Sequence, residues 1–527
     1  MKYEQVLIDG VWRDAVSSGS LQAVDPATGK KLPENYPESS WNDIDMALTA
    51  ASTASVAMRT LSRKRIGDFL ESYAEAIEAN AEEIVAVAHR ETALALRPRL
   101  ADIELPRTTG QLRQAAAAAR EGSWLSTTID TATNIRSQFA PLGPICVFGP
   151  NNFPMAFNAV SGGDFAAAIA AGNPVIAKAH PNHPGTTRLL AEAVRKAIEE
   201  TDMPPGTVQM IYHMDHADGQ RLVADSRLGA TAYTGSRSGG LKLKAAADRA
   251  GRPIYLELSS VNPIVLLPGA VEERAEAIAD EFVASCLMAT GQFCTNPGMV
   301  LLVGGFATES LIKALAGRFK TADPGPLLSS GVRESLIQGI AALKDAGATV
   351  IVGDEAVDSP GFHYANTLLR VSGDAFLNRP GDLQSEAFGN ESLIVVATDA
   401  EQLLAIVEHL EGNLTGCVYS DTGGGDDALY DRVAARLRVR IGRLLNDKMP
   451  TGVAVSPAMQ HGGPFPASGH PGFTAVGIPA SLRRFAALEC YDNVRSHRLP
   501  ASLQDKNPTP RMWRLIDGVW TQGDVGT

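Results

Sequence analysis

The segment Gly143–Asn152 (GPICVFGPNN) places four consecutive apolar residues directly before a turn of glycine, proline and asparagine. Similar apolar runs recur through residues 143–268, and stretches with apolar residues at helical spacing lie between several of them. Strands and helices that alternate in this way, with strands almost wholly apolar, predict a parallel sheet covered by helices on both faces. The expected strands are Ile145–Phe148, Val175–Lys178, Val208–Tyr212, Ala230–Tyr233, Ile254–Leu258 and Ile264–Leu267.

The rest of the chain extends this α/β pattern. Residues 42–119 have the composition and apolar spacing of helices, and residues 272–455 form a second α/β stretch. Residues 127–136 are polar and β-branched, which predicts an exposed hairpin. The string LIDGVW occurs at Leu7–Trp12 and again at Leu515–Trp520, and each copy predicts a two-residue Asp-Gly hairpin. Nothing around the two copies repeats, so convergence of short hairpins explains them better than a duplicated domain.

Composition excludes several classes of protein. A chain of 527 residues is expected to form two or three domains, and 45% apolar with 20% charged residues is ordinary for a globular protein. A formal net charge of −12 argues against general nucleic-acid binding. The five cysteines include no CxxC pair, so we expect neither a disulfide framework nor a metal site. The N-terminus lacks a secretory h-region, and no apolar run is long enough to span a membrane, so the expected location is the cytoplasm.

Polar residues follow several of the expected strands, at the edge of a parallel sheet where ligands bind. Asn152 could donate its side-chain amide to an oxyanion, although asparagine beside proline and glycine is also ordinary turn chemistry. Lys178 could bind the hydroxyls of a ribose or be a solvated lysine. The segment Thr234–Gly240 (TGSRSGG) precedes a helix, where backbone N–H groups suit a pyrophosphate, but it is not a GxGxxG motif.

Two further residues offer the chemistry of covalent catalysis. Cys294 lies in the turn-rich segment Gly291–Gly298 (GQFCTNPG), and Glu257 ends the expected strand Ile254–Leu258. A thiol with a separate carboxylate is sufficient for a thioester mechanism. Cys294 could equally be a packing thiol, and Glu257 a surface carboxylate at the end of a strand. Cys286 lies in an apolar helical run and is expected to be core.

Taken in chain order, these residues resemble the aldehyde dehydrogenase superfamily, and the match runs from about Ala47 to Asn493. The resemblance implies an α/β fold with a Rossmann-type cofactor domain, an α/β catalytic domain and a small β oligomerisation element. The domain ranges that follow are 1–124, 143–258 and 459–481 for cofactor binding, 259–458 for catalysis, 125–142 and 482–498 for oligomerisation, and 499–527 as a C-terminal extension. The matching residues are Asn152, Lys178, Gly235, Ser236, Gly240, Glu257, Cys294, Glu386 and Phe388.

The resemblance also implies a reaction. Cys294 attacks an aldehyde, while the Asn152 amide and the Cys294 N–H hold the oxyanion. Hydride then passes to a nicotinamide cofactor, and Glu257 activates the water that hydrolyses the resulting thioester. The cofactor residues would be Lys178, His180, Gly235, Ser236, Gly240, Glu386 and Phe388.

Within the superfamily, three stretches resemble α-ketoglutaric semialdehyde dehydrogenases and NADP-dependent fatty aldehyde dehydrogenases. They are Lys178–Thr186 (KAHPNHPGT), Glu257–Pro263 (ELSSVNP) and Gly291–Gly298. The expected substrate is a semialdehyde such as 2,5-dioxopentanoate. A basic residue facing the substrate funnel would favour this semialdehyde, and an apolar funnel would favour a fatty aldehyde. A CoA-acylating enzyme and a non-catalytic binding protein are further alternatives, which Glu257 and the complete residue set disfavour.

The sequence departs from the commoner family pattern at three places. Ser259-Ser260 replaces Gly-Gly, and Asn390 replaces the proline after Phe388-Gly389. Pro181 stands where NAD-preferring members carry an acidic residue, so a 2′-phosphate meets no repulsion, and NADP is favoured over NAD. By the same resemblance, we expect a homodimer or homotetramer.

Overall fold

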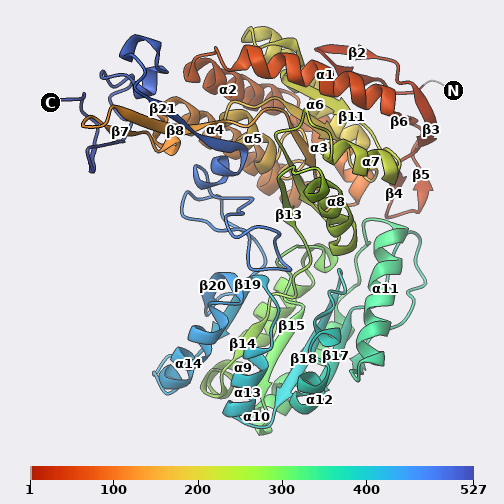
Figure 1. The fold of residues 1–527 in the computed structure, drawn as a ribbon. Coiled ribbons are helices and arrows are strands. Elements are labelled where there is room, and N and C mark those ends of the chain that lie inside the picture. Colours follow the sequence, from red (N-terminus) through yellow and green to blue (C-terminus); the bar gives the residue numbers. More distant parts are fainter. Residues whose placement is uncertain (1–2, 527) are drawn as a thin grey trace.

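Two seven-stranded sheets organise the structure, which is a computed structural model that describes residues 3–526. Each sheet forms the centre of one lobe, and helices α1–α8 surround the first sheet while α9–α14 surround the second (Figure 1). The α/β fold class expected from the sequence is confirmed. In the first lobe the helices are α1 (Trp41–Met58), α2 (Arg63–Ala79), α3 (Ala81–Thr92), α4 (Leu105–Glu121), α5 (Gly163–Ala170), α6 (Pro184–Glu200), α7 (His216–Val223) and α8 (Arg237–Arg249).

The first sheet has the order β13-β12-β9-β10-β11-β1-β2. Its first five strands are parallel, and β1 and β2 extend it in antiparallel fashion. All six strands expected between residues 143 and 268 exist within one residue of their expected ends, although the last belongs to the second sheet. The strands of the first sheet are β13 (Ile254–Glu257), β12 (Ala230–Thr234), β9 (Ile145–Phe148), β10 (Val175–Lys178), β11 (Val208–Ile211), β1 (Val6–Ile8) and β2 (Val11–Arg13).

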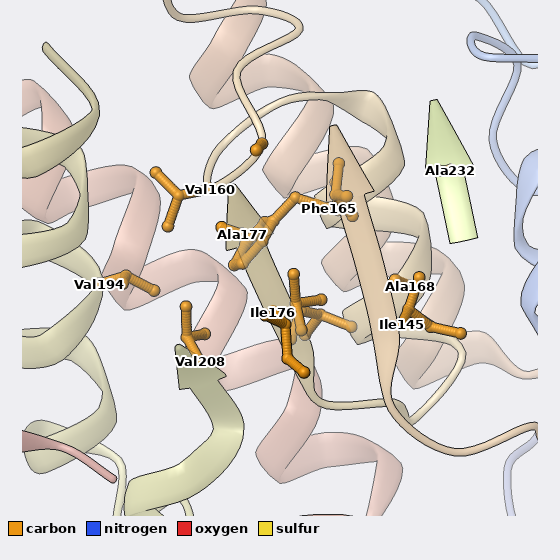
Figure 2. Close-up of a cluster of buried hydrophobic side chains, with 14 of the residues drawn as sticks. Ile145, Val160, Phe165, Ala168, Ile176, Ala177, Val194, Val208 and Ala232 are labelled. Atoms are coloured by element: carbon orange, nitrogen blue, oxygen red, sulfur yellow. The ribbon is translucent and has the colours of Figure 1, made fainter. Parts of the chain in front are cut away.

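Burial explains why these strands are apolar without alternation. Every residue of β9 and β11 is buried, and successive side chains of a strand point to opposite faces, so helices cover both faces of the sheet. Figure 2 shows Ile145 and Ile176 on neighbouring strands beside Phe165 of α5 and Val194 of α6. The polar turns after the strands therefore collect at one edge, beyond the carboxyl ends.

The second sheet has the order β16-β17-β18-β15-β14-β19-β20, and only β16 runs antiparallel to its neighbour. The apolar segments Met299–Val303, Thr349–Val352, Leu393–Val396 and Cys417–Tyr419 predict β15, β16, β18 and β19, but no such segment predicts β17 or β20. The strands are β14 (Ile264–Leu266), β15 (Met299–Val303), β16 (Thr349–Val352), β17 (Thr367–Ser372), β18 (Glu391–Ala397), β19 (Asn413–Tyr419) and β20 (Ile441–Asn446). The helices are α9 (Pro268–Cys286), α10 (Phe306–Thr321), α11 (Ser330–Asp345), α12 (Gly373–Asn378), α13 (Ala400–Glu408) and α14 (Asp427–Leu437).

A third sheet, of order β21-β8-β7-β22-β23, projects from the first lobe (Figure 1). The expected hairpin at residues 127–136 is present as β7 and β8, and β21 pairs with β8. The C-terminal tail supplies the other two strands. The strands are β7 (Thr128–Asp130), β8 (Ile135–Pro141), β21 (Ala486–Asp492), β22 (Arg514–Ile516) and β23 (Val519–Thr521). Four further strands, β3 (Ser17–Leu21), β4 (Val24–Asp25), β5 (Lys30–Lys31) and β6 (Tyr36–Ser39), form two small sheets.

Both copies of LIDGVW form hairpins, as the sequence predicts. The turn residues Asp9 and Gly10 have φ of 54° and 73°, and Asp517 and Gly518 have φ of 48° and 81°. Two consecutive left-handed residues give the turn that matches the twist of a two-residue hairpin. The N-terminal copy extends the first sheet through β11, and the C-terminal copy extends the third sheet through β7.

The chain passes from the first sheet to the second between β13 and β14, in residues 258–263. A later segment returns from the second lobe to the first. There the Leu258 N–H donates to Ala467 at 2.9 Å, and the Gly469 N–H donates to Leu256 at 3.0 Å. These two crossings lie at the carboxyl end of β13, next to Glu257. Within residues 3–526, no helix is long and apolar enough to cross a bilayer.

Candidate active site

The two lobes bring a thiol, an imidazole and a carboxylate together. His461 Nε2 lies 3.4 Å from Cys294 Sγ and 3.1 Å from Glu257 Oε1. The ligand-type atoms of all three residues lie within 4.8 Å of one another. Cys294 and Glu257 were expected here from the sequence, and His461 was not.

The Cys294 turn is held in a conformation that few residues adopt. Ala289, Thr290 and Gly291 have consecutive φ values of 46°, 58° and 68°. A side chain at Gly291 would meet the carbonyl oxygen of Gly389 at 2.0 Å, so only glycine fits there. Left-handed residues in a row cost free energy and persist where the surroundings fix them, which is common at active sites.

Glu257 ends β13, where its backbone carbonyl accepts a hydrogen bond from Gly235 at 3.1 Å. The residue is 1% exposed. One carboxylate oxygen meets His461, and the other, Oε2, is buried without a partner among the described residues. An unpaired buried carboxylate oxygen is costly, so this atom is available to a proton or a water at the site.

His461 reaches the site from the second crossing between the lobes. Its backbone N–H donates to Thr474 Oγ1 at 3.0 Å, and its ring is 1% exposed. The neighbouring Gly462 and Gly463 allow the backbone to pass close to other segments, since a side chain on Gly463 would meet the Asn413 carbonyl at 2.2 Å. The glycine- and proline-rich stretch at residues 461–466 predicts an ordered loop but no function, because 167 residues separate this histidine from Cys294.

Asn152 follows β9 and is 5% exposed. Its Nδ2 donates to the Gln292 carbonyl at 3.0 Å, which ties this loop to the Cys294 turn and leaves a second amide proton. Arg99 donates to the Asn152 carbonyl at 3.0 Å and pairs with the buried Glu104. Glu104 in turn accepts from two backbone N–H groups a few residues after Asn152. A buried ion pair therefore fixes the amide.

Burial also sets the protonation of the site. Burial raises the pKa of the Cys294 thiol well above its usual range, and the Glu257 carboxylate adds to this effect, while Arg107 opposes it. A protonated thiol is a poor nucleophile, so Cys294 needs a base to remove its proton. His461 Nε2 and the Glu257 carboxylate are both within reach of it.

A cleft of about 380 Å³ extends from this cluster across the carboxyl edge of the first sheet. Eight of the ten residues assigned from the sequence line it, and Lys178 and Gly240 do not. A side chain at Gly240 would meet Leu258 at 2.5 Å, so this glycine lets α8 pack close to the cleft wall. The eight are Asn152, His180, Gly235, Ser236, Glu257, Cys294, Glu386 and Phe388.

The cleft has the features that a dinucleotide requires. Ser236 caps α8 by accepting from the Gly239 N–H at 3.3 Å, so the start of a helix with free N–H groups faces the cleft, as suits a pyrophosphate. Glu386 also lines the cleft, and burial raises its pKa to about 7. Hydrogen bonds from the Ser259 side chain and the Ser260 backbone oppose this rise. A buried carboxyl of this kind suits a ribose hydroxyl.

The departures from the family pattern have structural reasons. Ser260 turns away from the cleft, since its hydroxyl meets Asn413 Oδ1 at 3.1 Å and accepts from the Leu414 N–H at 3.0 Å. Ser259 faces the cleft beside Glu386. Asn390 is fully buried and donates to the Tyr364 carbonyl at 2.9 Å. Of the serine pair, Ser259 alone therefore lines the cleft.

Comparison with curated proteins gives close relatives. The chain is 37% identical to α-ketoglutaric semialdehyde dehydrogenase 2 of Azospirillum brasilense, over 96% of this chain and 97% of that protein. It is 35% identical to α-ketoglutaric semialdehyde dehydrogenase of Acinetobacter baylyi, over 97% of both chains.

Solved structures share the fold. PnpE in complex with nicotinamide adenine dinucleotide matches with a TM-score of 0.80 at 22% identity, covering 94% of this chain and 99% of that chain. A mutant of aldehyde dehydrogenase C from Pseudomonas syringae, complexed with NAD+ and octanal, matches with a TM-score of 0.80 at 20% identity, covering 93% and 96%. The model of the aldehyde dehydrogenase family matches residues 12–469. The chain belongs to the aldehyde dehydrogenase family.

Proposed function

We propose that the protein oxidises an aldehyde whose far end carries a carboxylate, such as 2,5-dioxopentanoate (α-ketoglutaric semialdehyde), to the acid with NAD(P). The observation that carries the proposal is the cluster of Cys294, His461 and Glu257, of which Cys294 and Glu257 line the cleft. The names of the two curated relatives support the choice of substrate.

The chemistry begins with the thiol. With Nε2 unprotonated, His461 takes the proton from Cys294 Sγ, and the sulfur attacks the aldehyde carbon. The imidazolium that forms then donates from Nε2 to Glu257 Oε1. The second amide proton of Asn152, together with the Cys294 N–H, stabilises the oxyanion of the adduct. Bound NAD(P) would supply the oxidant that converts this adduct into a thioester on Cys294.

Hydrolysis completes the reaction. Glu257 Oε2 has no partner among the described residues, so it can take a proton from a water that attacks the thioester. Return of that proton to the sulfur restores the thiol and releases the acid, and the proton that His461 took from the thiol in the first step passes to solvent, which resets the imidazole for the next turnover. A positioned base of this kind favours hydrolysis over transfer of the acyl group to CoA.

Glu257→Gln tests the role of the carboxylate in hydrolysis. We expect a rapid burst of reduced cofactor, up to about one equivalent per active site, and a steady-state rate lowered about 100-fold or more. Stopped-flow absorbance at the reduced-cofactor band separates the two phases. Cys294→Ala is the control and should give neither phase, and a Glu257→Gln enzyme with the wild-type steady rate would refute the assignment.

His461→Asn tests the base for the thiol. Because burial raises the thiol pKa, removing the base should lower the rate of Cys294 alkylation by iodoacetamide about 100-fold at pH 7 and move its rise with pH to higher values. Mass spectrometry of the peptide that carries Cys294 measures this rate. The matched control is His470→Asn, an exposed histidine of the same loop. An unchanged pH profile in His461→Asn would eliminate the imidazole as base.

We infer a preference for NADP over NAD. Pro181 lies between His180 and Asn182, which both line the cleft, and it brings no negative charge. The charged groups that shift the pKa of His180 are His183, Lys178 and His213, none of them acidic. A 2′-phosphate beside these residues therefore meets positive or neutral groups.

Pro181→Glu tests this inference by adding a carboxylate. We expect kcat/KM for NADP to fall about fivefold or more, because a like charge a few ångströms away costs at least ~1 kcal/mol. The value for NAD should change much less. Pro181→Gln has a similar shape without the charge and serves as control. Wild-type enzyme that favours NAD would overturn the preference itself.

We also propose assembly into a homodimer or homotetramer through β21. This strand is the last in its sheet, and its Leu488 is 62% exposed, so its free edge can pair with another chain. Light scattering should give the mass of two or four chains, and Leu488→Lys should weaken the assembly while Leu96→Lys, at an exposed leucine outside this sheet, should not. A monomeric wild type would contradict the proposal.

The cytoplasm stays the proposed location, since all five cysteines are unpaired.

A further inference from the structure

Two arginines, one from each lobe, hold the loop formed by residues 450–459. Arg107 of α4 donates from Nη1 to the Val453 carbonyl at 2.8 Å. Arg443 of β20 donates from Nη2 to the Pro450 carbonyl at 2.9 Å. Neither side chain forms an ion pair among the described residues, although both guanidinium groups keep their charge at every physiological pH.

Arg107 keeps a pair of donors unused. Its Nε and Nη2 are both buried without a hydrogen-bond partner, and it is the only arginine within residues 3–526 of which this is true. These two nitrogens form one edge of the guanidinium plane, and their N–H bonds point the same way, which is the geometry that binds a carboxylate through both oxygens. Buried donors without a partner are costly, so the site is built for an anion that the chain itself does not supply.

Aromatic side chains join this edge to the reacting atoms. The Arg107 guanidinium lies 5.7 Å from the ring centre of Phe153 and 5.1 Å from that of Phe157. Phe153 follows Asn152 in the chain and packs edge to face on Phe293, which precedes Cys294. The Phe157 ring centre is 6.0 Å from that of His461. A short apolar chain between the thiol and Arg107 would therefore contact aromatic rings along its length.

Electrostatics connects the same groups. Burial lowers the pKa of the Arg107 guanidinium, and the charges that oppose this effect belong to Cys294, Glu104 and Glu257. Burial likewise lowers the pKa of Arg443, and Cys294 is first among the groups that oppose it. The charge of Cys294 therefore acts on both arginines. Neither arginine lines the cofactor cleft.

Arg99, a third arginine near these aromatic rings, is not available to bind an anion in the same way. It stacks over Phe153 at 4.4 Å, but its guanidinium is already engaged by Glu104 and by the Asn152 carbonyl. Its charge is neutralised by a buried partner, whereas that of Arg107 is not.

We propose that Arg107 binds the distal carboxylate of the aldehyde substrate through Nε and Nη2, with Arg443, which holds the same loop from the second lobe, adding positive charge. This inference rests on the proposed function and makes it more specific. The substrate class is a short aliphatic chain with an aldehyde at one end and a carboxylate at the other. A fatty aldehyde would leave the two N–H donors of Arg107 buried without a hydrogen-bond partner, so the site would bind a fatty aldehyde less well than a semialdehyde.

The test compares two aldehydes of equal length, 5-oxopentanoate and pentanal, which differ only in the distal carboxylate. For the wild type, kcat/KM should be about 100-fold higher with 5-oxopentanoate, since a site built for a charged hydrogen-bonding group rejects the analogue that lacks it. In Arg107→Met, this ratio should fall about 30- to 100-fold, mainly through KM.

Three measurements separate recognition from a structural role. Arg107→Gln keeps a donor for the Val453 carbonyl, so it preserves the loop contact if Arg107→Met fails to fold, and its ratio should fall as well. Arg113→Met removes an arginine of the same helix that pairs with surface glutamates, and its ratio should stay at the wild-type value. Calorimetric binding of glutarate, which needs no turnover, should weaken about 30-fold or more in both Arg107 variants.

The outcomes distinguish the two proposals. Equal loss of activity toward both aldehydes, or unchanged glutarate binding, would overturn Arg107 as the receptor. A wild type that oxidises pentanal as well as 5-oxopentanoate would overturn the inference but leave aldehyde oxidation standing. A wild type that reduces neither NAD nor NADP with any aldehyde would refute the proposed function itself.

Discussion

The side-chain amides of Asn413 and Asn262 connect the segment that follows Glu257 to the segment that carries Cys294. Asn413 Oδ1, at the start of β19, accepts from the backbone N–H groups of Val261 and Asn262 at 2.9 and 3.1 Å. Asn262 Nδ2 then donates to the carbonyls of Cys294 and Asn296 at 2.9 and 2.8 Å. Asn262 adopts a left-handed φ of 47°, which asparagine tolerates better than most residues. Glu257 and Cys294 come from different lobes, and this buried network connects the segment that follows Glu257 to the segment that carries Cys294.

Burial gives the site its reactivity and its main difficulty. An environment that excludes water strengthens the hydrogen bonds that Asn152 can offer to an oxyanion, but it also raises the pKa of the Cys294 thiol. Two features of the structure compensate for this. His461 lies between Cys294 and Glu257, and the positive charge of Arg107 opposes the rise in the thiol pKa. The arginine that we assign to the substrate carboxylate thus also favours the thiolate.

Sequence patterns predicted most of the first lobe and part of the site. Short apolar strands followed by polar turns located Asn152 and Glu257, because a parallel sheet collects such turns at one edge. The pattern failed for β17 and β20, and it gave the C-terminal tail no place, although β22 joins the third sheet by pairing with β7. It also missed His461 and Arg107. Both residues reach the site from distant segments, and neither position carries a local periodicity or motif that distinguishes it from a loop or surface residue.

The segment from residue 450 to residue 461 connects substrate recognition to catalysis. Arg107 holds it at the Val453 carbonyl, and Arg443 holds it at Pro450. A few residues later, the same segment delivers His461 to the thiol. An anion that pairs with Arg107 would therefore bind next to the contact that positions this loop, and the loop leads to His461, which we propose as the base for Cys294. Arg107 would use Nε and Nη2 for the carboxylate and already uses Nη1 for the loop, so binding of the proposed substrate would stabilise the loop that leads to His461.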